Sequence, residues 1–472
     1  MAGFRFFAAS VGHRTLRFPL ITPPLGLMYL ASIARERYNA QARIINQRLH
    51  NLSNDALVRE AVDFSPDIIA LSAFTPGKKF LSDICAKIKA ALPNVLLLVG
   101  GPHASAVGAQ ILRESQADIA VPSEGETALE LIIQHYLSDR SWDSIPGIFW
   151  RDANGDVVEN PGKTTLIEDL DTLPFPAYDL ADLPAYWRKQ SMPPVSYRRY
   201  ATLMSSRGCP YGCKWCHNIF GRRYRAHSAE RIIDEILYYQ KTYGVNDFEF
   251  QDDIFNMDHG RLIAFCELVH KRNLKIKFAF PNGLRTDILE EAEIDALISA
   301  GAYFSAFALE TGSPRLQQAM GKRLDIGRFL HNVAYATKKG IFSTGFFMLG
   351  FPDETADEME ATIEVGCASA LHTASFFNVT PFPNTEVYEM ALKNHAEKLL
   401  NHDYTHHDYA SSRLNISAEP DDVVWRLQRQ ANKRFYSPKR IYRIVRDTPA
   451  PLQLFLYVPH FIDRVLKGAL GH

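Results

Sequence analysis

The chain has 472 residues, with 52 lysines and arginines against 53 aspartates and glutamates and a formal net charge of -1. This balance excludes a nucleic-acid binder that works by bulk positive charge, and 46% apolar residues exclude an extended disordered chain. The length exceeds what one hydrophobic core usually serves, so we expect two or three domains and a folded enzyme. Residues 1–10 lack the apolar run and cleavage site of a signal peptide, and no apolar run of membrane-spanning length follows, so we expect a cytoplasmic protein.

Residues 1–140 alternate short apolar runs with segments of helical length. Helices are predicted at Leu25–Tyr38 and Lys78–Ala91. The predicted strands are Phe4–Ala8, Arg43–Asn46, Ile68–Ser72, Val95–Gly100 and Ile119–Val121. This alternation is typical of an α/β fold with a doubly wound parallel sheet, which binds ligands at the carboxyl ends of its strands. The loops at that edge are residues 72–77, 100–105 and 123–126.

Residues 141–198 are predicted to form an ordered connector. It starts with a hairpin of Ile148–Arg151 and Val157–Glu159, joined through Asn154 and Gly155. Prolines then accumulate, which makes the backbone irregular, although aromatic residues there can pack on a neighbouring domain. The prolines are Pro174, Pro176, Pro184, Pro193 and Pro194, and the aromatic residues are Phe175, Tyr178, Tyr186 and Trp187.

A second alternating series fills residues 199–385. Its helices include Ala229–Tyr243, His259–Lys271 and Asp325–Lys339. The predicted strands are Thr202–Ser205, Asp247–Gln251, Ile276–Phe280, Tyr303–Leu309, Phe342–Leu349 and Ser375–Thr380. Six such repeats favour a partial (β/α)6 barrel of the TIM type over a second open sheet. Residues 386–472 are predicted to be a helical carboxyl-terminal region.

A C-x3-C-x2-C motif, formed by Cys209, Cys213 and Cys216, follows the first strand of this second series. Three thiolates on one loop can hold a metal centre, and all-sulfur ligation favours zinc or an iron–sulfur cluster. In a [4Fe–4S] cluster, three cysteines leave one iron open to a small molecule. The alternatives are a Cys3His zinc site with His217, for which adjacent ligands are awkward chelators, and C-x-x-C-H haem attachment, which belongs in secreted proteins. The other cysteines lie on apolar helical stretches and are predicted to be packing residues: Cys85, Cys266 and Cys367.

With this motif the chain resembles the radical S-adenosylmethionine (SAM) enzymes of the cobalamin-binding subgroup, which include the class B methyltransferases. The resemblance implies that Cys209, Cys213 and Cys216 hold a [4Fe–4S] cluster whose open iron binds the amino and carboxylate groups of SAM. In the family, the aromatic residue just before the third cysteine lies near the adenine. Trp215 occupies that place in this chain.

Polar residues recur where the predicted barrel strands end, the catalytic face of such barrels. They are Asp252, Asp253, Arg285 and Glu310. The resemblance implies that Asp252 and Asp253 lie near the SAM amino group, in place of the usual Gly-Gly-Glu, and that Glu310 lies near the ribose and methionine. It also implies that the segment Gly345–Pro352, which contains Gly350, lies beside the adenine. For each acidic residue, a helix N-cap or a surface charge is the alternative.

The first domain resembles cobalamin-binding domains in its loops. Glycines let the backbone approach a flat macrocycle closely, and amide groups at helix starts can bind its polar edges. The residues that the resemblance places around cobalamin are Ser72, Thr75, Gly100, Gly101, His103, Glu124, Gly125 and Glu126. No Asp-x-His-x-x-Gly motif is present, so we expect cobalamin without a protein imidazole on cobalt. The alternative is a domain that has lost cobalamin and only supports the barrel.

Two further features are weaker. His402 and His406 have the spacing of metal ligands on one helical face, but a solvated or substrate-facing segment is the stronger interpretation. The basic, aromatic carboxyl-terminal tail suggests a peripheral membrane contact or closure over an apolar substrate, whereas packing on the barrel is slightly favoured.

We therefore predict a cobalamin-dependent radical SAM methyltransferase that acts on an unactivated carbon of a hydrophobic small molecule or lipid-like substrate. The resemblance implies that the reduced cluster cleaves SAM, that the 5′-deoxyadenosyl radical removes a substrate hydrogen, and that methylcobalamin supplies the methyl group. It also implies an electron donor such as flavodoxin or ferredoxin, and it names no catalytic side chain. The alternatives are a non-methylating cobalamin radical SAM enzyme, such as a cyclase, and a non-catalytic iron–sulfur redox module.

Overall fold

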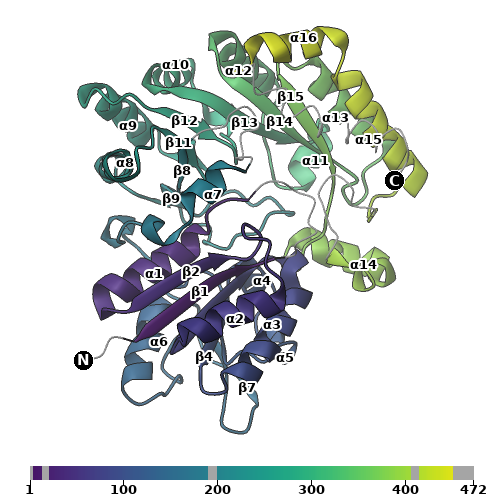
Figure 1. The fold of residues 1–472 in the computed structure, drawn as a ribbon. Helices are drawn as coiled ribbons and strands as arrows, with labels where there is room; N and C mark the ends of the chain where they lie inside the picture. Colours follow the sequence, from purple (N-terminus) through teal and green to yellow (C-terminus); the bar gives the residue numbers. More distant parts are fainter. Residues whose placement is uncertain (1–3, 13–20, 190–198, 405–413, 450–472) are drawn as a thin grey trace.

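The computed structural model describes residues 4–12, 21–189, 199–404 and 414–449, which form two α/β units and a helical region (Figure 1). The first unit has a seven-stranded sheet with strand order β2-β1-β3-β4-β5-β6-β7. Its strands are β1 (Arg5–Val11), β2 (Gln41–Asn46), β3 (Ile68–Ala73), β4 (Leu96–Gly100), β5 (Ile119–Ala120), β6 (Phe149–Arg151) and β7 (Val157–Glu159). Its helices are α1 (Leu25–Tyr38), α2 (Asn54–Phe64), α3 (Lys78–Ala91), α4 (Gly101–Val107), α5 (Gln110–Arg113) and α6 (Glu126–Leu137).

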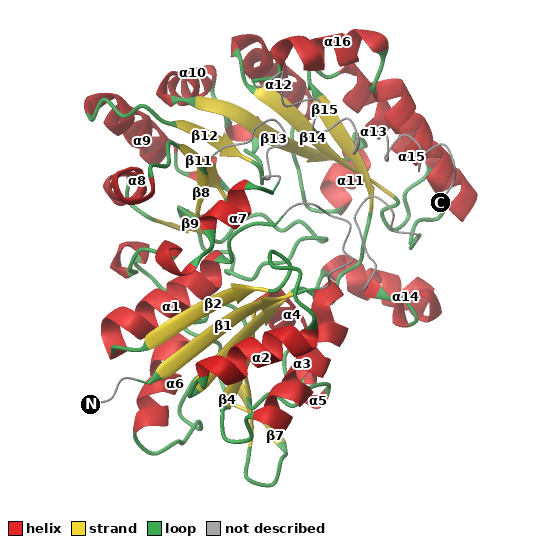
Figure 2. Ribbon diagram, in the orientation of Figure 1, coloured by secondary structure: helices red, strands yellow, loops and turns green. Residues whose placement is uncertain are grey.

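Helices cover both faces of this first sheet (Figure 2). Because successive strand residues point to opposite faces, Phe7 packs in one apolar core with α2 and α3, and Phe6 packs in another with α1 and α6. Strands β1 to β5 are parallel. The predicted doubly wound parallel sheet is therefore confirmed.

The predicted hairpin is present as β6 and β7, but it belongs to the first sheet. Strand β6 pairs antiparallel with β5, so Ile119 faces Trp150 and Ala120 faces Phe149. The interpretation of residues 141–198 as a connector outside the first domain is therefore wrong for the hairpin. The pairing covers the edge of β5, which would otherwise expose unpaired backbone groups.

The described rest of the connector, residues 160–189 with helix α7 (Leu183–Trp187), packs on the second unit, whereas residues 190–198, with Pro193 and Pro194, lie outside the described residues. The Tyr178 hydroxyl donates to the Thr202 carbonyl oxygen at 2.7 Å, and the Phe175 ring stacks on Tyr238. Aromatic packing therefore orders this described part, as the sequence predicts.

The second unit is a six-stranded parallel sheet with strand order β15-β14-β13-β12-β11-β8. Its strands are β8 (Tyr200–Leu203), β11 (Asp247–Phe250), β12 (Lys277–Phe280), β13 (Ala302–Glu310), β14 (Phe342–Leu349) and β15 (Thr373–Asn378). The helices are α8 (Ala229–Tyr243), α9 (His259–Lys271), α10 (Glu291–Ala300), α11 (Pro314–Ala319), α12 (Ile326–Lys339) and α13 (Ala356–Ala368). The end strands β8 and β15 do not pair with each other in the described chain, which confirms a partial barrel.

The carboxyl-terminal region contains α14 (Glu386–Leu400), α15 (Asp421–Phe435) and α16 (Pro438–Asp447). Helices α15 and α16 pack on the β15 edge of the barrel, where the Arg440 guanidinium donates to the carbonyl oxygens of Leu371 and Cys367. Helices α15 and α16 therefore confirm the predicted packing of the carboxyl-terminal region on the barrel. The tail from residue 450 onward, with the predicted membrane contact, lies outside the described residues. Among the described helices, none has the length and apolar character needed to cross a membrane.

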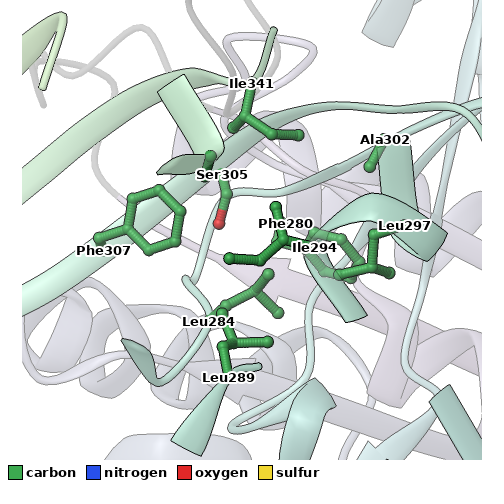
Figure 3. A pocket seen from close by; sticks show the side chains of 10 residues that line it. Phe280, Leu284, Leu289, Ile294, Leu297, Ala302, Ser305, Phe307 and Ile341 are labelled. Carbon is green, nitrogen blue, oxygen red and sulfur yellow. The ribbon is translucent and has the colours of Figure 1, made fainter. Parts of the chain in front are cut away.

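A small cavity lies within the barrel domain (Figure 3). Its volume is about 10 Å³, which is room for roughly one water molecule. Apolar side chains such as Leu284, Ile294 and Phe307 line it, together with Ser305. We assign it to imperfect packing of the core and not to a ligand site.

Candidate functional site

The cysteine motif lies on the loop of residues 208–224, which leaves β9 (Ser206–Arg207) and returns through β10 (Arg225–Ala226). Gly208 has a φ of +83°, and a Cβ there would lie 2.2 Å from the Arg223 carbonyl oxygen. Only glycine fits this narrow neck. Further along, the Lys214 amide donates to the Met320 carbonyl oxygen at 3.0 Å, so the loop rests on the segment after α11.

Cys209, Cys213 and Cys216 are free thiols in the structure. Desolvation raises the pKa of all three thiols, that of Cys216 to about 12, and the charged side chains near them are Asp253, Arg285, Glu310 and Lys322. In the described residues, no three His, Cys, Asp or Glu side chains converge as ligands of a single ion. A four-iron cluster binds one thiolate per iron, so it does not require such convergence. Three free sulfur donors on one loop fit an iron–sulfur cluster chemically.

Asp252 and Asp253 follow β11 and hold the start of the cysteine loop. Asp252 is buried and accepts hydrogen bonds from the Ser205 amide, the Ser205 hydroxyl and the Ser206 hydroxyl at 2.6–2.7 Å. Its carboxylate is therefore engaged, which argues against the predicted SAM contact at this residue. Asp253 is exposed, and among the described residues it accepts a hydrogen bond from the Gly208 amide, at 3.2 Å. Desolvation by the surrounding protein raises the pKa of the Asp253 carboxyl to about 6, and the side chain can face a ligand.

Trp215 lies beside the turn after β14, and the resemblance places both of these segments near the adenine. Its ring meets the Phe351 ring edge-on at 5.2 Å, next to Gly350. The amides of Gly350 and Phe351 both donate to Glu354, at 2.6 and 2.9 Å. Burial raises the pKa of Glu354 to about 8. Sequence reasoning missed Glu354. Its position four residues after Gly350 is the available signal, because a carboxylate there can accept from the amides of the turn.

Glu310 ends β13, and Arg285 lies on the loop that follows the neighbouring strand β12. Glu310 has a φ of +71°, which is unusual for a glutamate, and it follows an irregular step in the β13–β14 pairing. It pairs with Lys322, a residue that sequence reasoning missed, and burial raises the pKa of Glu310. The Arg285 guanidinium lies over the Tyr211 ring of the cysteine loop at 3.5 Å, and it is paired with Asp287. The predicted barrel residues are thus brought together around the thiols.

In the first domain, the loops after β3 and β4 come close together. Gly101 has a φ of +82°, and a Cβ there would lie 2.3 Å from the Ser72 hydroxyl oxygen. Thr75 is buried on the same loop as Ser72. His103 is 2% exposed, and its Nδ1 has no hydrogen-bond partner in the described chain. The missing side chain at Gly101 lets the start of α4 lie against Ser72 of β3, and the unsatisfied buried nitrogen of His103 fits a ligand with polar groups at its edge.

Glu124 and Glu126, which the resemblance places around cobalamin, form ion pairs with the protein's own arginines. Both carboxylates are buried against arginines of the second unit, Arg207 and Arg225. This arrangement argues against direct contact with cobalamin. Gly125 lies between them and starts α6, with Leu30 in ordinary contact.

The alternative metal ligands gain no support, whereas the cysteines outside the loop pack as predicted. The His217 Nε2 lies 2.9 Å from the Pro383 carbonyl oxygen, to which it can donate, so a hydrogen bond engages the ring of the zinc alternative. His402 meets the Tyr404 ring edge-on, and His406 lies outside the described residues. Cys85 and Cys266 are buried in the two cores, as predicted, while Cys367 is partly buried against the barrel core.

Two family models match the chain. Residues 14–133 match the B12 binding domain, and residues 203–365 match the radical SAM superfamily. The chain is a cobalamin-binding radical SAM enzyme. This membership implies cobalamin, SAM and a [4Fe–4S] cluster as its cofactors, and the cysteine loop lies within the radical SAM match.

Named relatives cover most of this enzyme. An uncharacterized methyltransferase of Pyrococcus horikoshii is 29% identical over 95% of this chain and 93% of its own length. An anaerobic magnesium-protoporphyrin IX monomethyl ester cyclase of Rubrivivax gelatinosus is 25% identical over 78% of this chain and 66% of its own. The solved structure of the cobalamin-dependent SAM radical enzyme OxsB, with aqua-cobalamin and SAM bound, has a TM-score of 0.67 and 21% identity. That match covers 85% of this chain and 56% of OxsB, and it supports the same fold.

Proposed function

We propose that this enzyme transfers a methyl group from SAM, by way of cobalamin, to an unactivated carbon of a hydrophobic small molecule. The observation that carries the proposal is direct contact between the loops at the carboxyl edges of the two sheets. The Ser123 hydroxyl, after β5, donates to the Ile219 carbonyl oxygen of the cysteine loop at 2.6 Å. The Asn384 amide group, after β15, donates to the Ser105 carbonyl oxygen in α4 at 3.4 Å.

These contacts hold the edge of the first sheet, which we propose binds cobalamin, against the loop that we propose holds the cluster. A reaction that uses both cofactors on one substrate requires this closeness. Cobalamin, SAM and the cluster supply the methyl and radical chemistry when bound. The protein binds and orients them. The three cysteines hold the cluster, Glu310, Lys322 and Asp253 offer charged partners to the methionine end of SAM, and Trp215 and Gly350 border its adenine.

Methyl transfer is favoured over other outcomes because the relative from Pyrococcus horikoshii is named a methyltransferase and matches nearly end to end. The Rubrivivax gelatinosus relative is named a cyclase, so a non-methylating cobalamin radical SAM reaction is the second candidate. Either reaction uses electrons from a donor such as a flavodoxin or ferredoxin. A cytoplasmic location stays a prediction.

Transfer of a labelled methyl group separates the two candidates without knowledge of the substrate. Reduced, cobalamin-loaded protein is incubated anaerobically with SAM that carries a CD3 group. We expect the CD3 label on the extracted cobalamin and S-adenosylhomocysteine as the second product, because the sulfonium loses its methyl group in that step. Formation of 5′-deoxyadenosine without any labelled cobalamin would support the non-methylating candidate instead.

A further inference from the structure

Four buried charged side chains join the first domain to the base of the cysteine loop. The Arg225 guanidinium is bidentate on Glu124, with Nη2–Oε1 at 2.5 Å and Nη1–Oε2 at 3.1 Å. Arg207 lies 2.7 Å from Glu126 Oε1 and 3.4 Å from Glu124 Oε2. Two carboxylates therefore balance two guanidiniums across the boundary between the domains.

This cluster of four is closed to solvent. The exposed fractions of its side chains range from 0% for Glu124 to 4% for Arg207 and Glu126. The Arg207 guanidinium lies over the rings of Tyr29 and Phe220, and Glu124 also accepts from the Ile167 amide at 2.9 Å. Burying ion pairs gives little net stability, because desolvation offsets their attraction, whereas their geometry is strictly defined. Their main effect is therefore to fix positions.

The two arginines mark the points where the cysteine loop begins and ends. Arg207 and Arg225 are opposite residues in the β9–β10 pair, so residues 208–224 enter and leave the loop at this one place. The neck at Gly208 follows Arg207 directly. Holding both arginines consequently holds both ends of the loop that carries the three cysteines.

The two glutamates come from the ligand-binding edge of the first sheet. They follow β5, next to Ser123, whose amide donates to the Ser105 hydroxyl of α4 at 2.8 Å. Helix α4 begins with Gly101 and contains His103. One short loop thus contacts both the cobalamin-side segment and the cysteine loop.

We propose that Glu124 and Glu126 are positioning residues that set the place of the cysteine loop, and so of its cluster, relative to cobalamin. They act through Arg207 and Arg225 and touch neither cofactor. The inference rests on the assignment of the two cofactors and is independent of methyl transfer, so the tests below measure no product.

The first test is hydrogen–deuterium exchange of the full-length protein. In Glu124→Gln and Glu126→Gln, an arginine is left buried without its counter-charge, so peptides that cover residues 208–224 should exchange roughly tenfold faster or more. Glu126→Asp keeps a carboxylate and should retain most of the protection. Lys79→Met removes an exposed ion pair between Lys79 and Asp403 and is the matched control, for which no change in the loop is expected. Unchanged exchange in both glutamine variants, or equally faster exchange throughout the chain, overturns the proposal.

The second test uses protein loaded with cluster and cobalamin. Pulsed electron paramagnetic resonance measures the distance distribution between the reduced cluster and cob(II)alamin, two paramagnetic centres. We expect a broader or shifted distribution in Glu124→Gln and Glu126→Gln at unchanged iron and cobalamin content, and a wild-type distribution in Lys79→Met. A wild-type distribution in all three variants overturns the proposal.

Discussion

Glu310 and Lys322 form a partly buried ion pair beside the cysteine loop, with Glu310 Oε1 3.6 Å from Lys322 Nζ. Both side chains are close to Cys213, on which their charges act in opposite directions. The methionine end of SAM carries one ammonium and one carboxylate group, so this pair offers each of them a partner of opposite charge. At 3.6 Å the two charged groups are farther apart than in a strong hydrogen bond, so each can bind a group of SAM in place of the other.

We therefore predict that Glu310→Gln and Lys322→Met each weaken SAM binding by about tenfold or more, the effect of losing one charge-assisted hydrogen bond. Iron content should not change, because neither residue is a thiol ligand. Equilibrium dialysis with SAM under anaerobic conditions measures the affinity. Lys271→Met, at an exposed position on α9, is the control. Wild-type affinity in both variants would place the methionine end of SAM elsewhere.

The cluster prediction concerns all six cysteines. Anaerobically reconstituted protein should contain about four irons and four sulfides, and alanine at Cys209, Cys213 and Cys216 together should abolish them. Single alanine variants of the cysteines outside the loop, Cys85, Cys266 and Cys367, should keep the full content. Iron and sulfide analysis with the visible spectrum checks both sets. Stoichiometric zinc after anaerobic purification would refute the assignment.

Local sequence patterns were sufficient for most helices and strands. The predicted helix Ala229–Tyr243 matches α8 because apolar residues recur on one face, the Ser228 hydroxyl caps its first turn and Gly244 ends it in a left-handed conformation. The hairpin Phe149–Glu159 was also predictable as a hairpin. Its pairing with β5 was not, because the partner of an edge strand depends on which edge the folded domain leaves open.

The site residues show the same division. The three cysteines and Trp215 are readable from spacing within one loop. Glu124 and Arg225 are 101 residues apart in the chain, and no local pattern indicates that they meet. Asp252 has the sequence context of a ligand contact, but its oxygens serve Ser205 and Ser206, which only the folded sheet brings within reach.

Two adjacent glycines give a matched test of the first domain. Gly101→Ala places a Cβ 2.3 Å from the Ser72 hydroxyl oxygen at a φ of +82°, whereas the nearest atom to a Cβ at Gly100 is 3.4 Å away. We predict that Gly101→Ala loses most cobalamin binding and lowers the thermal midpoint of unfolding, while Gly100→Ala keeps both nearly unchanged. The absorbance of bound cobalamin after gel filtration reports the first effect. Equal behaviour of the two variants would contradict a close backbone approach at Gly101.

His372 predicts an acid-sensitive contact between the barrel and α16. Burial, with a smaller effect of Arg443, lowers the pKa of His372 to about 4, although Asp447 Oδ2 lies 3.2 Å from its Nε2. The folded pKa is below the ordinary value of about 6.5, so the unfolded chain binds the extra proton as pH falls from about 6.5 to 4. The contribution of His372 to the free energy of unfolding is fully present above about pH 6.5, and it is lost as the pH falls towards about 4.

The decrease attributable to His372 should approach about 3 kcal/mol at pH 4, as a shift of this size implies. His372→Gln should therefore show a shallower fall of the thermal midpoint between pH 6.5 and 4 than the wild type. His50→Gln, at an exposed position, is the control and should follow the wild-type curve. His103 and His227, whose pKa values burial also lowers to about 4, add slope of the same sign to both proteins. Identical curves for wild type and His372→Gln would show that this histidine does not titrate across the transition.

The last prediction concerns the His103 imidazole, which is enclosed in the first turn of α4 and neutral at pH 7, since burial lowers its pKa to about 4. Its Nδ1 lacks a hydrogen-bond partner in the described residues, and a buried polar atom in that state is best explained by a ligand or water that completes it. We expect a polar group at the edge of cobalamin to do so, and we expect cobalt to carry no protein nitrogen.

The cob(II)alamin form should then show an electron paramagnetic resonance spectrum without axial nitrogen splitting, in wild type and in His103→Phe alike, while His103→Phe binds cobalamin several-fold more weakly. His135→Phe, on α6, is the control for a histidine that takes no part in the site. Nitrogen splitting that disappears in His103→Phe would instead make this side chain the axial ligand of cobalt.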